Sequence, residues 1–175
     1  MTELEKMDFE GYKSGFVALV GKPNVGKSTL LNYYIGQKIA AVSFRPQTTR
    51  KRQLGILTLE DAQIIFVDTP GLHSGDYKLS DFINEEAQYA LMDSDLILFV
   101  VDSSQFPDQE DRQIAEKVLE RSGNASLLLV MNKIDLVEQN LIETHEVAYK
   151  ELLDFDDTIR ISAITETGRD KLLER

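Results

Sequence analysis

Cysteine is absent from this chain of 175 residues. Without it the protein can form neither disulfides nor a cysteine-ligated zinc site nor a thiol-based catalytic centre, and a cytoplasmic location is expected from this composition. Long apolar runs are missing as well. The longest, 96–101 and 127–131, fall far short of the ~20 residues that cross a bilayer. We therefore expect buried strands there and no transmembrane segment.

Positive charge is scarce, because 19 Lys and Arg stand against 30 Asp and Glu, for a formal net charge of −11. That balance opposes binding to polyanions, so direct nucleic-acid binding by these residues is not expected. A local basic cluster at 45 and 50–52 is interpreted as a solvated face or charged strand edge, with a partner contact as the alternative. The acidic start resembles no signal or transit peptide, and residues 1–14 are expected to be a flexible leader.

Glycine is infrequent, with 10 residues in the chain, but two of them lie in the stretch 21–28. This stretch reads GKPNVGKS, a phosphate-binding loop pattern. Gly21 and Gly26 allow backbone N–H groups to approach a phosphate chain closely. Lys27 is expected on the outer phosphates and the Ser28 hydroxyl on a magnesium ion. The nucleotide-binding residues predicted here are Gly21, Asn24, Val25, Gly26, Lys27, Ser28 and Thr29.

Apolar runs alternate with helical patterns along the whole chain. Strands are expected at 15–20, 54–59, 63–67, 96–101, 126–131 and 158–161, and helices at 28–35, 79–92, 109–121, 141–153 and 168–175. The second and third strands form a hairpin, since only an acidic turn separates them. The predicted fold is an α/β P-loop NTPase: a doubly wound, mostly parallel six-stranded sheet with one antiparallel edge strand and helices on both faces.

Two further segments are expected to reach the phosphates. Residues 36–49 lack periodicity and are interpreted as a switch segment, in which Thr49 joins the magnesium site; Thr48 is an alternative, and so is a plain polar turn. Asp68 follows an apolar strand, where it can hold magnesium through water, and the Gly71 N–H can meet the terminal phosphate.

The sequence NKID at 132–135 follows another strand and predicts a base-binding site. The Asp135 carboxylate can accept from N1–H and the exocyclic amine of guanine, whereas adenine has an acceptor at N1 and no amine at C2, so guanine is the predicted base. Asn132 is expected to brace the pocket and the phosphate loop, and the Lys133 stem to lie along the base. A helix-capping turn is the alternative. The Ala163 N–H is expected to face the guanine carbonyl. The predicted set is Asn132, Lys133, Asp135, Ser162, Ala163 and Ile164.

The chain carries, in this order, the segments GKPNVGKSTLLN, PQTTR, DTPGLH, NKID and SA. Together they resemble the motifs of the translation-factor-related GTPases, and PQTTR with DTPGLH is similar to the Era subgroup. The resemblance runs from residue 15 onward. It implies a switch that binds GTP or GDP with Mg²⁺ and hydrolyses GTP. For the Era subgroup it also implies small-ribosomal-subunit assembly through a carboxyl-terminal KH domain that binds ribosomal RNA, and peripheral membrane association.

No KH-type G-x-x-G loop follows residue 164. We therefore expect the GTPase domain alone, at 15–175, with a truncated last helix, no KH domain and a monomeric state.

The resemblance also bears on catalysis. The expected catalytic residues are Asn24, Lys27, Thr49, Asp68 and Gly71. Asn24 resembles the asparagine that binds potassium in related loops; the alternative is that it only stabilises the turn. Leu72 stands where Ras-like GTPases carry a water-orienting glutamine, so slow hydrolysis is expected. An ATP-using P-loop kinase or ATPase leaves NKID unexplained, and a nucleotide-dependent binding module with incidental hydrolysis remains a further alternative.

Overall fold

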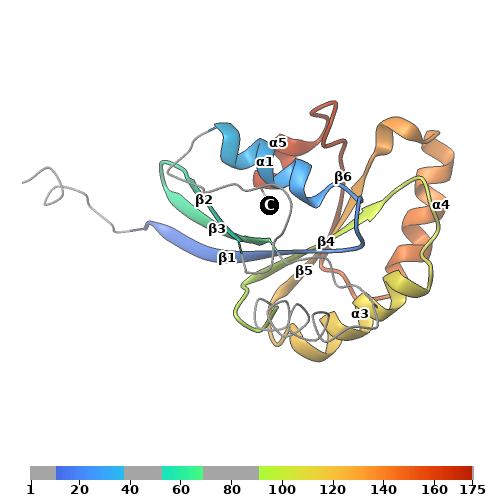
Figure 1. Ribbon diagram of the computed structural model, residues 1–175, viewed down its shortest axis with the longest axis horizontal. Helices are drawn as coiled ribbons and strands as arrows, with labels where there is room; N and C mark the ends of the chain where they lie inside the picture. The colour runs from blue at the N-terminus through green and yellow to red at the C-terminus, as the bar shows by residue number, and fades with distance from the viewer. Residues whose placement is uncertain (1–10, 38–52, 69–90, 175) are drawn as a thin grey trace, which may run out of the picture.

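The computed structural model describes residues 11–37, 53–68 and 91–174 (Figure 1). The strands are β1 (Lys13–Val20), β2 (Gln53–Thr58), β3 (Ala62–Asp68), β4 (Leu96–Asp102), β5 (Ser126–Asn132) and β6 (Asp157–Arg160). The described helices are α1 (Lys27–Gln37), α3 (Gln109–Arg121), α4 (Gln139–Lys150) and α5 (Arg169–Leu173), with a short 3₁₀ turn, η2 (Ile134–Leu136). No helix in these ranges has the length and hydropathy needed to cross a membrane.

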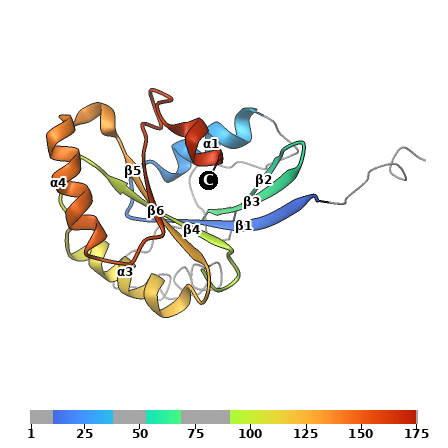
Figure 2. The ribbon, with the colours of Figure 1, turned by 180° about the vertical axis from the view of Figure 1, so that it is seen from behind.

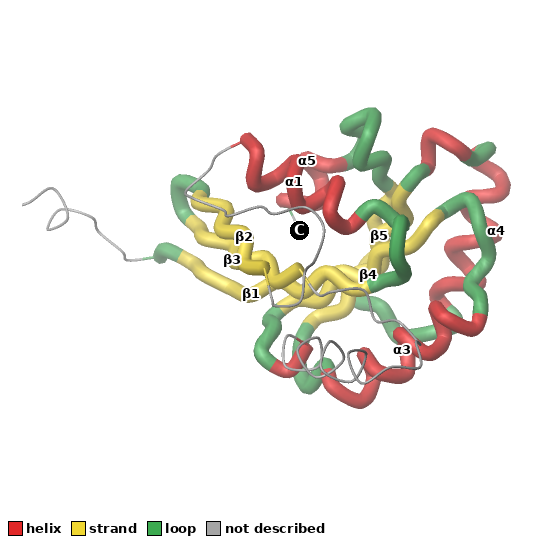
Figure 3. The backbone as a smooth tube through the Cα atoms, viewed as in Figure 1, coloured by secondary structure: helices red, strands yellow, loops and turns green. Residues whose placement is uncertain are grey.

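One six-stranded sheet runs through the molecule in the order β2-β3-β1-β4-β5-β6 (Figure 3). β2 is antiparallel to β3, and the remaining neighbours are parallel. The predicted fold, with its antiparallel edge strand, is therefore confirmed. The carboxyl ends of parallel strands meet at one edge of a sheet, so β1, β3, β4, β5 and β6 all end along that edge.

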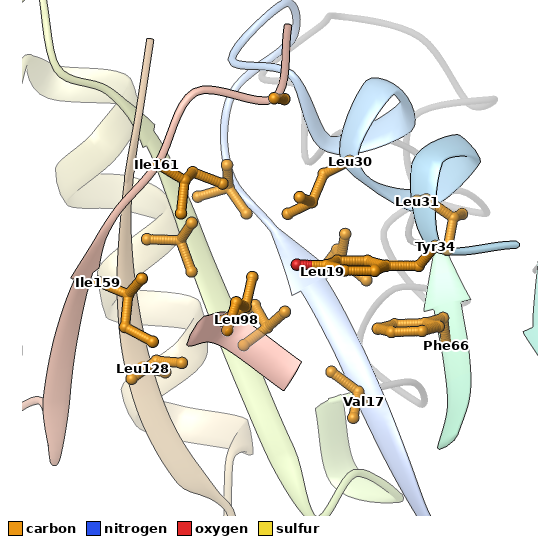
Figure 4. Packing of buried hydrophobic residues seen from close by; sticks show 14 of the residues in the cluster. Val17, Leu19, Leu30, Leu31, Tyr34, Phe66, Leu98, Leu128, Ile159 and Ile161 are labelled. Carbon is orange, nitrogen blue, oxygen red and sulfur yellow. The ribbon is translucent and has the colours of Figure 1, made fainter. Parts of the chain in front are cut away.

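Helices cover both faces of the sheet: α1 and α5 lie on one, α3 and α4 on the other (Figures 1 and 2). Successive residues of β1 pack on opposite faces of the sheet, because strand side chains alternate in direction. Val17 and Leu19 join the core beneath α1 and α5, whereas Ala18 and Val20 join the core beneath α3 and α4. The first core is shown in Figure 4, where Tyr34 of α1 stacks on Phe66 of β3 with ring centroids 5.8 Å apart.

The bounds of the described helices lie within three residues of expectation, and α4 differs most at its end. Helix 109–121 occurs as predicted, but the helix expected at 141–153 begins earlier, at Gln139, and ends earlier, at Lys150. Its predicted last residue, Leu153, is still buried, because the chain turns back toward the sheet after the helix ends. Apolar spacing thus indicated the burial of Leu153 correctly, but it misplaced the helix end, and Leu141, the expected first residue, is 45% exposed. Helix 79–92 lies almost wholly outside the described residues.

Candidate functional site

The phosphate loop joins β1 to α1 through three residues with positive φ: Gly21 at 142°, Asn24 at 62° and Gly26 at 105°. A Cβ atom on Gly21 would lie 2.1 Å from the Val100 carbonyl oxygen, and one on Gly26 would lie 2.1 Å from Asn132 Nδ2. Both glycines are therefore required by backbone conformation and by close contact.

Lys27, the first residue of α1, is buried and turned back over this loop. Its ammonium donates to the carbonyl oxygens of Gly21 and Lys22, each at 2.7 Å. Ser28 and Thr29, in the first helical turn, are exposed. Backbone N–H groups at a helix start attract anions. A cavity of about 270 Å³ opens here, and it is lined by Asn24, Gly26, Lys27, Ser28 and Thr29.

A second cavity, of about 320 Å³, lies beside the first. Asn24, Gly26 and Thr29 line both, so the two cavities adjoin, and we refer to them together as the groove. The remaining wall of the second cavity consists of Asn132, Lys133, Asp135, Leu136, Ser162, Ala163 and Ile164. A mostly apolar compartment of this size suits a planar base, and the polar one beside it suits a phosphate chain. The groove therefore joins two chemically different binding regions.

Asn132 connects these regions. Its side chain is buried; Nδ2 donates to the Val25 carbonyl at 2.7 Å, and Oδ1 accepts from the Ala163 N–H at 2.9 Å. The predicted brace between pocket and phosphate loop is present in this geometry. The Ala163 N–H, expected to face a guanine carbonyl, donates to Asn132 instead. A base carbonyl would have to share or replace that hydrogen bond.

The segment after β6 is supported from behind by α5. Arg169, at the start of α5, is 3% exposed, and its Nη1 donates to the Ala163 carbonyl at 3.3 Å. Tyr34 of α1 donates through its hydroxyl to the Arg169 carbonyl at 2.7 Å. Helices α1 and α5 thus hold the segment at the far wall of the cavity, although no sequence signal singled out Arg169.

Lys133 has a left-handed conformation, with φ at 65°, and its ammonium lies 2.6 Å from Asp102 Oδ2. Asp102 ends β4 directly beside Asn132 in the sheet and also accepts from the N–H and hydroxyl of Ser104. Burial would raise the pKa of Asp102, but the hydrogen bonds from Lys133 and Ser104 outweigh it and lower that pKa. Sequence reasoning missed Asp102, although its place after a buried strand was the available signal.

We expect Asp102→Asn to lower the free energy of unfolding by about 1–2 kcal/mol at pH 7, because a partly buried charged hydrogen bond is lost. Since the folded pKa of Asp102 is depressed, its contribution is present above the ordinary aspartate pKa and disappears as pH falls through the lowered value. Urea unfolding between pH 3 and pH 7 checks this. A variant whose stability deficit persists unchanged at pH 3 contradicts the assignment.

Asp135 lies in η2 and is exposed at the cavity mouth. Leu136 and Ile164, both lining the cavity, expose 67% and 76% of their surface and offer apolar contacts that a base could cover. Leu136 was not anticipated. A larger hollow of about 810 Å³ lies beside β6, but its lining, which includes Glu146, Arg160 and Lys171, contains none of the predicted site residues.

The remaining predicted residues cannot be placed in the same way. Thr48, Thr49, Gly71 and Leu72 lie outside the described residues. Asp68 is the last residue of β3, where its backbone lies beside Leu19 of β1. It therefore sits at the sheet edge that carries the phosphate loop.

Comparison with known proteins agrees with this geometry. Residues 16–133 match the family model described as 50S ribosome-binding GTPase. GTPase Era of Geobacter metallireducens is 42% identical over 163 residues, and GTPase Era of Thermoanaerobacter sp. is 46% identical over 165 residues. These alignments cover 93% and 94% of this chain and 54% of each relative, so the chain spans about half their length.

Two solved structures share the fold. An Era variant from Aquifex aeolicus bound to GDP and AlF₄⁻ is 34% identical with a TM-score of 0.78. Era in complex with MgGDPNP and a segment of 16S ribosomal RNA is 36% identical, also with a TM-score of 0.78. Each alignment covers 93% of this chain and 55% of the other. Because the family model matches more than half of the residues, the chain belongs to the 50S ribosome-binding GTPase family, and it is Era-like.

Proposed function

We propose that this chain binds GTP in the groove between β1, β5 and the segment after β6, and hydrolyses it to GDP and phosphate. The observation that carries the proposal is the double hydrogen bond of Asn132 to Val25 and Ala163. It fastens the base region to the phosphate region, so a single ligand with a base at one end and phosphates at the other fits both. The Era structures solved with GDP and with GDPNP support the same ligand.

Each predicted site residue has a role in this proposal. Asp135 reads the guanine edge, Asn132 holds the two regions together, and Lys27 neutralises the outer phosphates. Ser28, exposed in the phosphate cavity, has the hard oxygen that magnesium prefers, and Thr49 and Asp68 are proposed to complete its ligands. Bound magnesium supplies charge neutralisation for the phosphates. Gly71 is proposed to offer its N–H to the terminal phosphate.

Hydrolysis by this chain is proposed to be slow, because Leu72 cannot orient water by hydrogen bonding. With GTP and Mg²⁺ we expect phosphate release at about 10⁻³ s⁻¹ or slower, and none from ATP. Single-turnover phosphate release with both nucleotides tests this. If GTP is bound but never cleaved, the result would favour the second candidate, a nucleotide-dependent binding module. The leucine at position 72, in place of a water-orienting glutamine, also fits that candidate.

Potassium is proposed to assist the reaction through Asn24, which lines both cavities. We expect phosphate release at least about tenfold faster in potassium than in sodium. Asn24→Gly separates this role from a turn role, because glycine keeps the positive φ of 62° and removes the amide. The variant should lose the potassium effect. Equal wild-type rates in both salts, or an Asn24→Gly variant with full stimulation, would sink the idea.

The wider role is proposed by similarity to Era. The solved Era complex contains 16S ribosomal RNA, and we propose that the nucleotide state of this chain controls assembly of the small ribosomal subunit in the cytoplasm, as a monomer. RNA contact is proposed to come from a KH domain rather than from these residues, whose net charge is −11. Peripheral membrane association is also proposed, on the family resemblance alone.

A further inference from the structure

Lys22, a variable position of the phosphate-loop pattern, makes a buried ionic contact with helix α3. Its ammonium, on a side chain 10% exposed, lies 2.8 Å from Asp108 Oδ2 and 2.8 Å from Asp111 Oδ2. The Asp111 side chain is 1% exposed, and its second oxygen, Oδ1, has no hydrogen-bond partner in the described part of the chain. Breaking such a pair leaves a buried charge, so Lys22 and Asp111 depend on each other.

Both carboxylates are already fixed when they meet Lys22. Asp108 caps α3 by accepting from the N–H groups of Glu110 and Asp111, and Asp111 accepts in return from the Asp108 N–H at 3.0 Å. Burial would lower the pKa of Lys22, but hydrogen bonds to the two carboxylates outweigh it and raise that pKa. The ammonium therefore stays charged near neutral pH and is held at one point by a rigid helix start.

The same residue contacts Lys27 through its backbone. The Lys22 carbonyl accepts from Lys27 Nζ at 2.7 Å, and the Gly21 carbonyl accepts at the same distance. Lys22 is thus anchored to α3 by its side chain and holds the Lys27 ammonium by its main chain. If the side chain were released, the carbonyl that directs Lys27 would lose its external support.

We propose that Lys22 is a positioning residue: its ion pair with Asp111 and Asp108 sets the phosphate-loop carbonyls that aim Lys27 at the phosphates. This proposal rests on the proposed function. It predicts a defect much larger for ligands that carry phosphate, since the base cavity takes most of its wall from residues 132–136 and 162–164 and only part of it from the phosphate loop. A general loss of structure would weaken every ligand alike.

The test compares the binding of GDP with that of guanosine, which has the base and no phosphate. Lys22→Met should weaken GDP binding by about tenfold to hundredfold, the scale of small misplacements in a site, and should weaken guanosine binding far less. Lys22→Arg should restore most of the GDP affinity, because it keeps the charge. Lys117→Met, on helix α3, is the matched control and should bind both ligands as wild type does.

Asp111→Asn provides a second approach should Lys22→Met fold poorly. It should weaken GDP binding less than Lys22→Met does. The double variant should bind GDP about as weakly as Lys22→Met alone, since both substitutions remove the same ion pair. Unchanged GDP affinity in Lys22→Met, or equal losses for GDP and guanosine, overturns the positioning role alone. A wild-type protein that binds guanosine but not GDP overturns the proposed function as well.

Discussion

Asp135→Asn should change the preferred base from guanine to xanthine. The carboxylate offers two acceptors to the two N–H groups of guanine, whereas an asparagine amide offers one acceptor and one donor. Xanthine carries a carbonyl where guanine carries its amine, so it matches the amide. Sites built on such hydrogen bonds reject an unmatched partner strongly, and we expect GTP affinity to fall at least about hundredfold while affinity for xanthosine triphosphate rises.

The structure makes this variant a clean test. Asp135 is exposed in η2 at the cavity mouth, so its replacement leaves the core intact. Asp154→Asn, at another exposed aspartate, is the control and should keep the guanine preference. Competition against labelled GDP measures both variants. If Asp135→Asn retains wild-type GTP affinity, the base pocket is misassigned.

Gly26→Ala should abolish nucleotide binding and destabilise the fold. The added Cβ would lie 2.1 Å from Asn132 Nδ2, at a φ of 105° that residues with a side chain rarely adopt. Asn132 would have to move, and its hydrogen bonds to Val25 and Ala163 would break. Backbone strain and unmet buried hydrogen bonds together should lower the free energy of unfolding by roughly 3 kcal/mol or more.

Gly36→Ala is the matched control for that change. Gly36 lies within α1, and a Cβ there meets no atom of another described segment within 4 Å. Alanine is the better helix residue, so this variant should be stabilised by up to about 1 kcal/mol and bind GDP normally. Denaturant unfolding and GDP titration of both variants provide the comparison. Wild-type GDP affinity in Gly26→Ala would contradict the close contact with Asn132.

Much of this molecule follows from local pattern. The run LILFVV of β4, before Asp102, is apolar throughout because helices cover both sides of a central parallel strand, and its burial confirms that interpretation. Because the phosphate loop and NKID each follow a parallel strand, the sequence predicted that both lie at one edge of the sheet. The hairpin of β2 and β3 followed from two apolar runs around a short acidic turn. These features depend on neighbours in sequence, which a pattern can record.

Contacts between distant segments were not predictable in the same way. The pairing of Lys133 with Asp102 and of Lys22 with Asp111 joins residues far apart in sequence. The hydrogen bond from the Ala163 N–H to Asn132 depends on how the segment after β6 approaches the end of β5. Such pairings follow from three-dimensional packing, to which residue spacing gives no guide. Thr49 and Gly71, outside the described residues, stay predictions.

The most direct test of the central claim is competition of GTP, GDP and ATP for the wild-type protein in the presence of Mg²⁺. The proposed site predicts that both guanine nucleotides bind and that ATP binds at least about hundredfold more weakly, because adenine lacks the pair of N–H groups from which Asp135 accepts. Equal affinity for ATP and GTP would contradict the assignment of the base pocket and favour an ATP-using P-loop enzyme instead.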